Sequence, residues 1–267
     1  MPTPLNDQEF SQFQKLIYQL AGINLSSAKK ALVSGRLAKR LAHYRLDSYG
    51  DYFKLLTASS NPDELQVAVD LLTTNETYFF REPKHFDFLR NTILPGHKSG
   101  RNFRVWSAAC SSGEEPYSIA MVLTDHFGDG SWEVLASDIC TRVLGKARNG
   151  HYPMDRTEGI SREHLSRYCL KGVGAQENTL LVDKKLRDRV NFMQVNLNQS
   201  LPALGEFDVI FLRNVMIYFD QETKRQIVQR MLRLLRPGGY FLIGHSESLN
   251  GVVDTLQPLV PSTYRKP

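Results

Sequence analysis

One segment of this 267-residue chain, Phe207 to Ser248, narrows its fold more than any other. It begins with the apolar run FDVIFL, continues through the polar pair Arg213 and Asn214, and then follows the pattern of an amphipathic helix. A Pro-Gly-Gly turn after that helix leads into a second apolar run, YFLIG. A strand, a helix and a strand in this order are typical of an open α/β sheet, in which polar groups after a strand face a ligand crevice.

Strand and helix patterns alternate from Asn102 onward, which predicts a mostly parallel, doubly wound α/β sheet with crossover helices. Residues 167–192 break this rhythm. The short apolar pieces LLV and RVNFMQV are separated there by charged and Gly-containing stretches, and we expect a small antiparallel β insertion. The other expected strands and helices, in chain order, are FRVWSAAC, YSIAMVLTDHF, WEVLASD and TRVLGKARNG.

The first 75 residues show only helical patterns and predict a small all-α domain, which precedes an α/β domain over residues 76–267. One of its helices has a clear start signal: Asn61 as N-cap, Pro62 at the first helical position and Glu64 three residues after the cap. The other helices expected from apolar residues at spacings of three and four cover residues 7–21, 27–44 and 48–56, and Pro83 opens a further one over 82–94.

Composition limits the classes of function. The excess of positive charge is mild, with 33 Lys plus Arg against 28 Asp plus Glu, so we expect no nucleic-acid partner. No apolar run approaches the roughly 18 residues that cross a bilayer, and the start of the chain lacks the pattern of a signal peptide. We therefore expect a cytoplasmic monomer with no direct membrane insertion. The three cysteines have no CxxC spacing and the seven histidines no HExxH spacing, so neither a disulfide nor a metal is expected.

The loop after the first of these strands, SSGEEP, indicates the kind of ligand. It has one glycine and two carboxylates, whereas phosphate-binding loops are rich in glycine and often carry a lysine. The dinucleotide pattern GxGxxG is also missing, which disfavours an NAD-dependent enzyme. Asp138 ends the next strand, where an acid accepts hydrogen bonds from ribose hydroxyls. A positively charged, ribose-bearing cofactor without phosphate fits both features, and S-adenosylmethionine is such a cofactor.

Longer motifs add a resemblance to a known family. In chain order they are LTTNETYFFRE, VWSAACSSGEEPYSIAM, ASDICTRVLGKARNGHY, FDVIFLRNVMIYFD and LLRPGGYFLIGHSES. With the basic helical N-terminal region, they resemble the chemotaxis receptor methyltransferase family, CheR, from about residue 10 to 265. The resemblance implies a class I methyltransferase fold, which is Rossmann-like. It also implies methyl transfer from S-adenosylmethionine to glutamates on the cytoplasmic coiled coil of chemoreceptors, giving glutamyl methyl esters and S-adenosylhomocysteine during chemotactic adaptation.

The resemblance further implies which residues carry the reaction. A glutamate carboxylate has an unperturbed pKa near 4.3, so the nucleophile is ionised at neutral pH and alignment is what the site must provide. Arg81 is the candidate for orienting that carboxylate or the cofactor, because a guanidinium matches carboxylate geometry. Tyr218 is the candidate beside the transferred methyl; from residue type alone, a surface arginine and a packing ring are the simpler interpretations. The implied cofactor contacts are Asn75, Thr77, Arg81, Glu115, Asp138, Asn196, Leu197, Arg213 and Asn214.

Residues 27–45 contain a second candidate interface. They include six basic residues and no acid: Lys29, Lys30, Arg36, Lys39, Arg40 and Arg45. Such a face is ordinarily solvated, and nucleic acid is another possible occupant. Because the methylated helices of the receptors are rich in glutamate, we expect Arg36, Lys39 and Arg40 to dock the substrate electrostatically.

Other functions stay open at this stage. An amine methyltransferase acting on DNA would carry a motif such as [DN]PP[YF], whereas this chain has RNVMIYF. A non-catalytic chemosensory module would bind the cofactor or a receptor without transferring a methyl group. The insertion at about 167–192 is either a dock for a C-terminal receptor peptide, as the resemblance suggests, or a plain structural hairpin.

Overall fold

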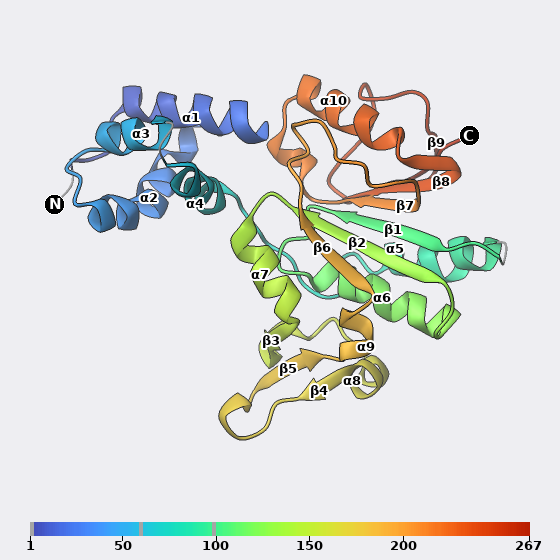
Figure 1. Ribbon diagram of the computed structural model, residues 1–267. Coiled ribbons are helices and arrows are strands. Elements are labelled where there is room, and N and C mark those ends of the chain that lie inside the picture. Colours follow the sequence, from blue (N-terminus) through green and yellow to red (C-terminus); the bar gives the residue numbers. More distant parts are fainter. Residues whose placement is uncertain (1–2, 59–60, 98–99) are drawn as a thin grey trace.

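The computed structural model describes residues 3–58, 61–97 and 100–267 (Figure 1). Asn6 starts the first helix with a capping box: its side chain accepts from the Glu9 N–H, and the Glu9 carboxylate accepts from the Asn6 N–H. No helix in the described ranges is long and apolar enough to cross a membrane. The N-terminal elements agree with the predicted helices: α1 (Asp7–Ala21), the 3₁₀ turn η1 (Ser27–Lys29), α2 (Lys30–Tyr44), α3 (Tyr49–Thr57) and α4 (Pro62–Leu72).

Glu64 does not cap α4, although the helix starts where the sequence indicates. Its side chain is buried and accepts hydrogen bonds from Arg40 Nε (2.8 Å), Tyr52 Oη (2.6 Å) and Tyr44 Oη (3.0 Å). Burial alone would raise the pKa of Glu64, but hydrogen bonds from Arg40 and the two tyrosines outweigh it and lower that pKa. The expected capping role is therefore wrong, because this carboxylate instead joins α4 to α2 and α3.

A seven-stranded sheet forms the centre of the rest of the chain, in the order β6-β2-β1-β7-β8-β10-β9. The first five strands of that order are parallel, and β10 and β9 are antiparallel, which confirms the predicted fold class. The strands are β1 (Phe103–Ala108), β2 (Trp132–Asp138), β6 (Val190–Gln194), β7 (Phe207–Leu212), β8 (Leu235–Ile243), β9 (Gln257–Val260) and β10 (Thr263–Arg265). The helical elements around them are α5 (Lys84–Phe88), η2 (Leu89–Ile93), η3 (Leu94–Gly96), α6 (Glu114–Phe127), α7 (Thr141–Asn149), η6 (Met216–Tyr218) and α10 (Gln221–Leu232).

Alternating residues of the central strands belong to two different cores. Trp106 and Ile210 pack in a cluster with α10 and the N-terminal helices, whereas Val105 and Phe211 pack in a cluster with α5 and α6. Helices α6 and α10 accordingly lie on opposite sides of the sheet (Figure 1). Because both faces are covered, every residue of β7 is buried, which explains why the strand is apolar apart from Asp208, whose carboxylate pairs with Arg101 and Arg236.

The sheet changes direction at β1. The chain runs from β1 to β2 and β6 on one side, and then returns to β7 and β8 on the other side. Loops that leave adjacent strands at such a switch point diverge and leave a crevice at the carboxyl ends of the strands. The residues after β1 and after β7, including Arg213 and Asn214, are therefore placed at this crevice.

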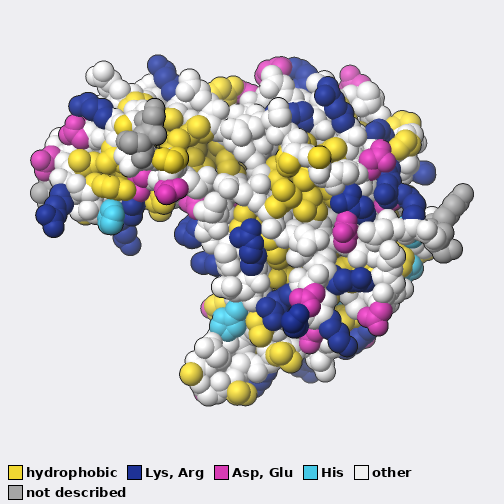
Figure 2. Space-filling view, in the orientation of Figure 1, with side chains coloured by type: hydrophobic (Ala, Val, Ile, Leu, Met, Phe, Trp, Pro, Cys, Tyr) yellow, Lys and Arg dark blue, Asp and Glu magenta, His cyan; other side chains and the backbone are white. Residues whose placement is uncertain are grey.

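A small antiparallel sheet projects from the body of the molecule (Figure 2). It contains β3 (His151–Pro153), β5 (Thr179–Val182) and β4 (Cys169–Lys171), in that order, with η4 (Met154–Arg156), α8 (Arg162–Tyr168), η5 (Gly174–Gln176) and α9 (Lys184–Arg187) beside them.

The limits of this sheet differ from the insertion expected at 167–192. LLV lies in β5 as expected, but RVNFMQV forms β6, which pairs in parallel with β2 in the main sheet. Burial of Val190 in the core beside α6 favours that pairing. The first strand of the small sheet, β3, was missed because three residues are too few to show an alternating pattern.

Asp70, near the end of α4, connects the N-terminal helices to the sheet. Its carboxylate accepts from the Thr141 N–H (3.0 Å), the Arg142 N–H (2.9 Å) and Thr141 Oγ1 (2.8 Å) at the start of α7. The N-cap residue of α7, Cys140, makes no capping hydrogen bond of its own. Asp70 thus takes over the capping hydrogen bonds of a helix in a distant part of the chain.

Replacing Asp70 by alanine should destabilise the protein by about 1–2 kcal/mol, the usual cost of a lost cap. At this chain length that corresponds to a fall in Tm of about 2–8 °C. Thermal denaturation followed by circular dichroism measures the change. Asp63→Ala is the matched control, because Asp63 is an exposed acid in the first turn of the same helix. Equal Tm values for the two variants would show that Asp70 does not hold α7.

Candidate active site

A cleft of about 400 Å³ lies at the crevice, between the N-terminal helices and the carboxyl ends of β1, β2 and β7. The structure brings all the predicted cofactor residues to its lining: Asn75, Thr77, Arg81, Glu115, Asp138, Asn196, Leu197, Arg213 and Asn214. Tyr218 also lines it, whereas Arg36, Lys39 and Arg40 do not. Lys29 and Leu32, from the same basic segment, do reach the cleft.

The loop after β1 turns tightly through left-handed backbone. Ala109, Ser111 and Gly113 have φ values of 62°, 51° and 97°. A Cβ on Gly113 would lie 2.8 Å from the Cβ of Ala147, so glycine is required there. Helix α6 begins directly after this glycine, three residues before the expected helix YSIAMVLTDHF, which places Glu115 in its first turn.

Asp138 holds the ends of two loops. Its Oδ2 accepts from the Ser111 N–H (2.8 Å), and its Oδ1 accepts from the Cys140 N–H (2.9 Å). The residue is only 6% exposed, and in the described ranges no cation forms an ion pair with it. Burial raises the pKa of Asp138, although these backbone hydrogen bonds oppose the rise. Further hydrogen-bond donors would stabilise this buried charge, because each oxygen has lone pairs left.

Arg213 is buried between two carboxylates at the base of the cleft. Its side chain is 1% exposed; Nη1 donates to Glu115 Oε2 (2.7 Å) and Nη2 to Glu82 Oε2 (2.9 Å). Ser107 Oγ donates to the second oxygen of Glu115 (2.7 Å). Two carboxylates and one guanidinium leave one negative charge, which suits a cationic ligand.

Glu82 and Glu247 belong to the site, yet sequence reasoning did not single them out. Glu82 accepts from Arg213 and from Asn214 Nδ2 (3.1 Å), and Glu247 accepts from the Asn214 N–H (2.9 Å) and the Gly244 N–H (2.7 Å). Burial alone would raise the pKa of Glu82, but the hydrogen bond and charge of Arg213 lower it to about 2. Burial raises the pKa of Glu247. Both residues lie in the motifs quoted above, but residue type alone does not show their partners.

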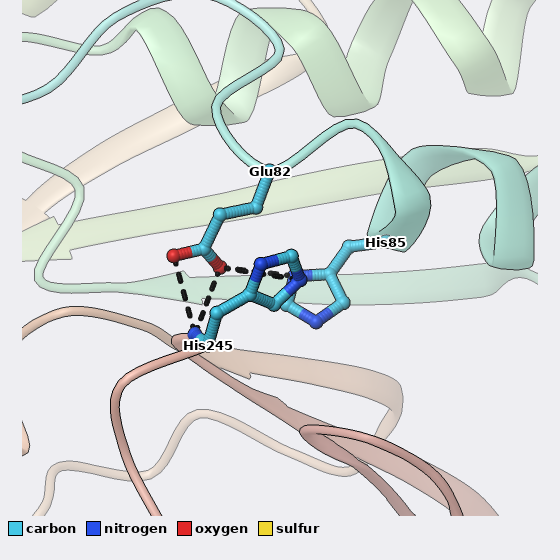
Figure 3. Close-up of side chains that lie close together, drawn as sticks. All are labelled: Glu82, His85 and His245. Atoms are coloured by element: carbon cyan, nitrogen blue, oxygen red, sulfur yellow. Dashed lines mark hydrogen bonds and ion pairs between the residues drawn. The ribbon is translucent and has the colours of Figure 1, made fainter.

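Glu82 also lies close to two histidines, His85 and His245 (Figure 3). His85 is buried on α5, and burial, together with the charge of Arg213, lowers its pKa to about 3. His245 follows β8, and its backbone N–H donates to Glu82 Oε1 (3.2 Å). The imidazole rings of the two histidines have centroids 4.8 Å apart.

Several predicted cofactor residues connect the N-terminal segment to the loops of the sheet across the cleft. The Asn196 side chain donates to the Leu20 carbonyl at the end of α1 (2.6 Å). The Asn75 carbonyl accepts from Ser111 Oγ (2.8 Å). Leu197 and Thr77 are buried beside them. The cleft is therefore shaped by the helical part and the sheet together.

Arg81 and Tyr218 lie at the same cleft with different surroundings. Arg81 is partly exposed, its Nη1 donates to the Glu76 carbonyl (2.9 Å), and its guanidinium lies over the Tyr78 ring (5.6 Å). Within the described ranges no carboxylate forms an ion pair with it. Tyr218 is partly buried in η6, and its carbonyl accepts from the Asn24 N–H (2.8 Å). Arg81 is thus a cation at the cleft that remains open to an anionic group.

Size and chemistry of the cleft fit S-adenosylmethionine. Its volume lies in the range of roughly 300–1,000 Å³ typical of small-molecule sites. Asp138 offers acceptors for ribose hydroxyls, and the negative cluster around Arg213 complements the positive charges of the cofactor. A switch-point cleft in this sheet, with an acid at the end of β2 and no phosphate-binding loop, fits the class I methyltransferases.

Comparisons with known proteins identify the family. The family model described as "CheR methyltransferase, SAM binding domain" matches residues 75–265, and "CheR methyltransferase, all-alpha domain" matches residues 8–73. The chain is 44% identical to a chemotaxis protein methyltransferase of Salmonella typhimurium over 93% of this chain and 86% of that protein. It is 38% identical to one of Borreliella burgdorferi over 98% of this chain and 95% of that protein. This chain therefore belongs to the CheR methyltransferase family and is an S-adenosylmethionine-dependent methyltransferase of chemotaxis.

Among solved structures, the glycopeptide N-methyltransferase MtfA in complex with S-adenosyl-L-methionine is similar to this chain with a TM-score of 0.37 and 18% sequence identity. The similarity covers 64% of this chain and 51% of that protein.

Proposed function

We propose that this methyltransferase esterifies glutamate side chains on the cytoplasmic coiled coil of chemoreceptors. The observation that carries the proposal is Arg81, a cation at the cofactor cleft without an acidic partner in the described ranges. Membership of the family supports the same substrate class. A carboxylate substrate needs such a group, because its charge must be held in place as it approaches the methyl group.

The reaction requires little proton chemistry from this chain. A glutamate side chain is ionised at neutral pH. When bound, S-adenosylmethionine supplies a methyl group on a positively charged sulfur, and the glutamate oxygen forms a C–O bond as the C–S bond breaks. Glu115, Asp138 and Asn214 hold the cofactor, Arg81 orients the carboxylate, and Tyr218 lies beside the transferred methyl. Alignment of this kind is worth several kcal/mol.

Labelled methyl transfer to purified receptor cytoplasmic fragments tests this function. We expect base-labile label on glutamate residues of the coiled coil, since methyl esters hydrolyse in base. A receptor fragment in which these glutamates are replaced by alanine is the control. Label that resists base, or label on DNA, would instead indicate an amine methyltransferase, and cofactor binding without label on any fragment would indicate a regulatory module.

The small sheet is a proposed dock for the C-terminal peptide of a receptor. Strand β4 lies at its edge, and Leu170 on β4 and Val173 beyond it are 55% and 80% exposed. An extended peptide can add to such an edge, which raises the local concentration of enzyme near its methylation sites. Fragments with and without their last five residues separate this role from a structural hairpin in the same assay, because only a dock makes the shorter fragment a poorer substrate.

Replacing Arg81 by alanine should lower kcat more than it lowers cofactor affinity, because the proposed role is to orient the substrate. Losing one positioning contact typically slows turnover by about a hundredfold when misalignment follows. Initial rates and calorimetric titration with S-adenosylhomocysteine give the two values. Arg81→Lys keeps the charge without the planar fork and should recover part of the rate. If affinity falls as far as kcat, Arg81 serves only as a cofactor ligand.

The basic face on α2 remains a proposed docking surface. Its basic side chains differ in how free they are to contact a receptor. Arg40 is bound to the buried Glu64, and Arg36 donates to the carbonyls of Leu72 (3.2 Å) and Thr73 (2.9 Å). Lys39 is exposed. Figure 2 shows Lys and Arg side chains bordering the recess between the N-terminal helices and the small sheet. Reversal of Arg36 or Arg40 would therefore disturb internal contacts as well as docking.

Lys39→Glu should raise the KM for receptor by about 1.5-fold to 5-fold, which corresponds to the roughly 0.2–1 kcal/mol of an exposed charge pair, and leave cofactor affinity unchanged. The KM of the wild-type enzyme should also rise with salt, since surface charges are screened beyond about 8–10 Å. Lys15→Glu is the control, because Lys15 is an exposed lysine on α1. A KM that depends neither on salt nor on Lys39 would leave the face as solvated surface.

A further inference from the structure

The cluster of Glu82, His85 and His245 lies beside the methyl-transfer cleft, and its two histidines have no part in the proposed reaction (Figure 3). Glu82 precedes α5, His85 lies on α5, and His245 follows β8. One potential ligand atom from each residue lies within 4.8 Å of the other two. Glu82 Oε2 is 3.4 Å from His85 Nδ1 and 4.0 Å from His245 Nε2.

We propose that these three side chains bind a divalent transition-metal ion of the Zn²⁺ class. Two imidazoles and one carboxylate are a common ligand set for zinc, in which a water completes the tetrahedron. The three residues come from two segments far apart in the sequence, so no sequence spacing typical of metal ligands predicts them. The absence of ligand spacing, and the fact that scattered histidines are more often structural, explain why the sequence predicts no metal.

The main support is the environment of His85. Its side chain is 2% exposed, and among the described residues neither ring nitrogen makes a hydrogen bond; Nδ1 has only the 3.4 Å contact with Glu82 Oε2. A buried polar atom without a partner costs about 1–3 kcal/mol. A histidine that only fills space at this position would therefore destabilise the folded protein. A bond from Nδ1 to a metal would satisfy one of these atoms, and the neutral form of the ring is the one that binds metals.

The geometry needs only a small adjustment. In a tetrahedral site with bonds of about 2.0–2.2 Å, neighbouring ligand atoms lie about 3.4 Å apart. Glu82 and His85 already have this separation, at 3.4 Å. His245 must approach Glu82 Oε2 from 4.0 Å and the His85 ring nitrogen from within 4.8 Å, and its side chain is 44% exposed, so it is able to rotate. The same exposure gives the ion a path from solvent.

Hydrogen bonds from neighbouring residues fix the orientation of the Glu82 carboxylate. Asn214 Nδ2 and the His245 N–H donate to Glu82 Oε1, and Arg213 Nη2 donates to Oε2. Such outer contacts orient metal ligands in known sites. They also connect the ion to the cleft, because a divalent charge would share Glu82 with Arg213 and repel its guanidinium. Metal binding should therefore weaken cofactor binding.

Titration of the untagged protein with Co²⁺ alone, followed by Zn²⁺ displacement, tests the site. Visible absorbance reports the coordination of Co²⁺, and its loss on displacement gives the zinc affinity. We expect one ion per chain. His245→Ala should lower the affinity at least roughly tenfold, since even outer-contact losses cost this much. His126→Ala, which removes another exposed histidine, should bind as the wild type does.

A second variant guards against misfolding. His85→Phe keeps an aromatic ring in the buried position and should also lose the Co²⁺ spectrum. No Co²⁺ spectrum from the wild type would overturn the proposal, and so would wild-type affinity in both His245→Ala and His85→Phe. An equal loss in His126→Ala would likewise overturn it, because binding would then be scattered among surface histidines.

The coupling to the cleft has its own measurement, which does not depend on the identity of the methylated substrate. At a Zn²⁺ concentration that fills the wild-type site but not the weakened site of His245→Ala, affinity for S-adenosylhomocysteine should fall severalfold for the wild type and stay constant for His245→Ala. Equal affinities for the wild type with and without Zn²⁺ would overturn the coupling.

Discussion

Replacement of Arg213 by methionine should abolish measurable cofactor binding and lower Tm by about 10 °C. The side chain is 1% exposed and lies between Glu82 and Glu115, whose side chains are 13% and 11% exposed. Removing it leaves two carboxylates close together without a cation. Breaking a buried ion pair from one side costs about 3–5 kcal/mol, and for a chain of this size each kcal/mol shifts Tm by about 2–4 °C.

Loss of binding should follow from the same contacts. Arg213 holds Glu115 in the first turn of α6 and Glu82 against Asn214, so its removal disturbs several residues of the cleft together. Thermal denaturation and titration with S-adenosylhomocysteine measure the two effects. Arg225→Met is the control, because Arg225 forms an exposed pair with Glu222 that should be worth little. A Tm within 2 °C or so of this control would mean that the carboxylates find other partners.

Much of the site was predictable because its residues follow strands. Asp138 and Arg213 end two apolar runs, and a parallel sheet brings the ends of its strands to one edge. The family resemblance supplied Asn75 and Asn196, which no periodic pattern indicates. The fold class followed from the alternation after Asn102, because burial on both faces makes such strands stand out.

The parts that sequence reasoning missed depend on partners from distant segments. Glu82 has a left-handed backbone, with a φ of 58°, and its role appears only when Arg213 and His245 are beside it. Glu64 has the spacing of a capping residue, but the cost of leaving Arg40 unpaired next to two tyrosines outweighs a cap. Tertiary contacts thus overrode a local signal at Glu64 and supplied a role without any local signal at Glu82.

Replacement of Asp138 by alanine should weaken binding of S-adenosylhomocysteine roughly tenfold to a hundredfold, since hydrogen bonds to a charged group contribute about 1.5–3 kcal/mol. Part of this loss would come from the protein itself. Asp138 also accepts from the N–H groups of Ser111 and Cys140, so the variant disturbs the loop after β1. Asp138→Asn should be little better, because its amide NH₂ would face one of these two donors.

A cofactor analogue separates the two contributions. The wild-type enzyme should bind S-adenosylhomocysteine more tightly than its 2′-deoxy analogue, because a ribose hydroxyl that donates to Asp138 stabilises a buried carboxylate. In Asp138→Ala the affinities for the two ligands should be nearly equal, since the acceptor is gone. Calorimetric titration of both proteins with both ligands gives the coupling energy directly. If the variant discriminates against the deoxy analogue as strongly as the wild type does, Asp138 only shapes the loop, and the ribose hydroxyls are held elsewhere.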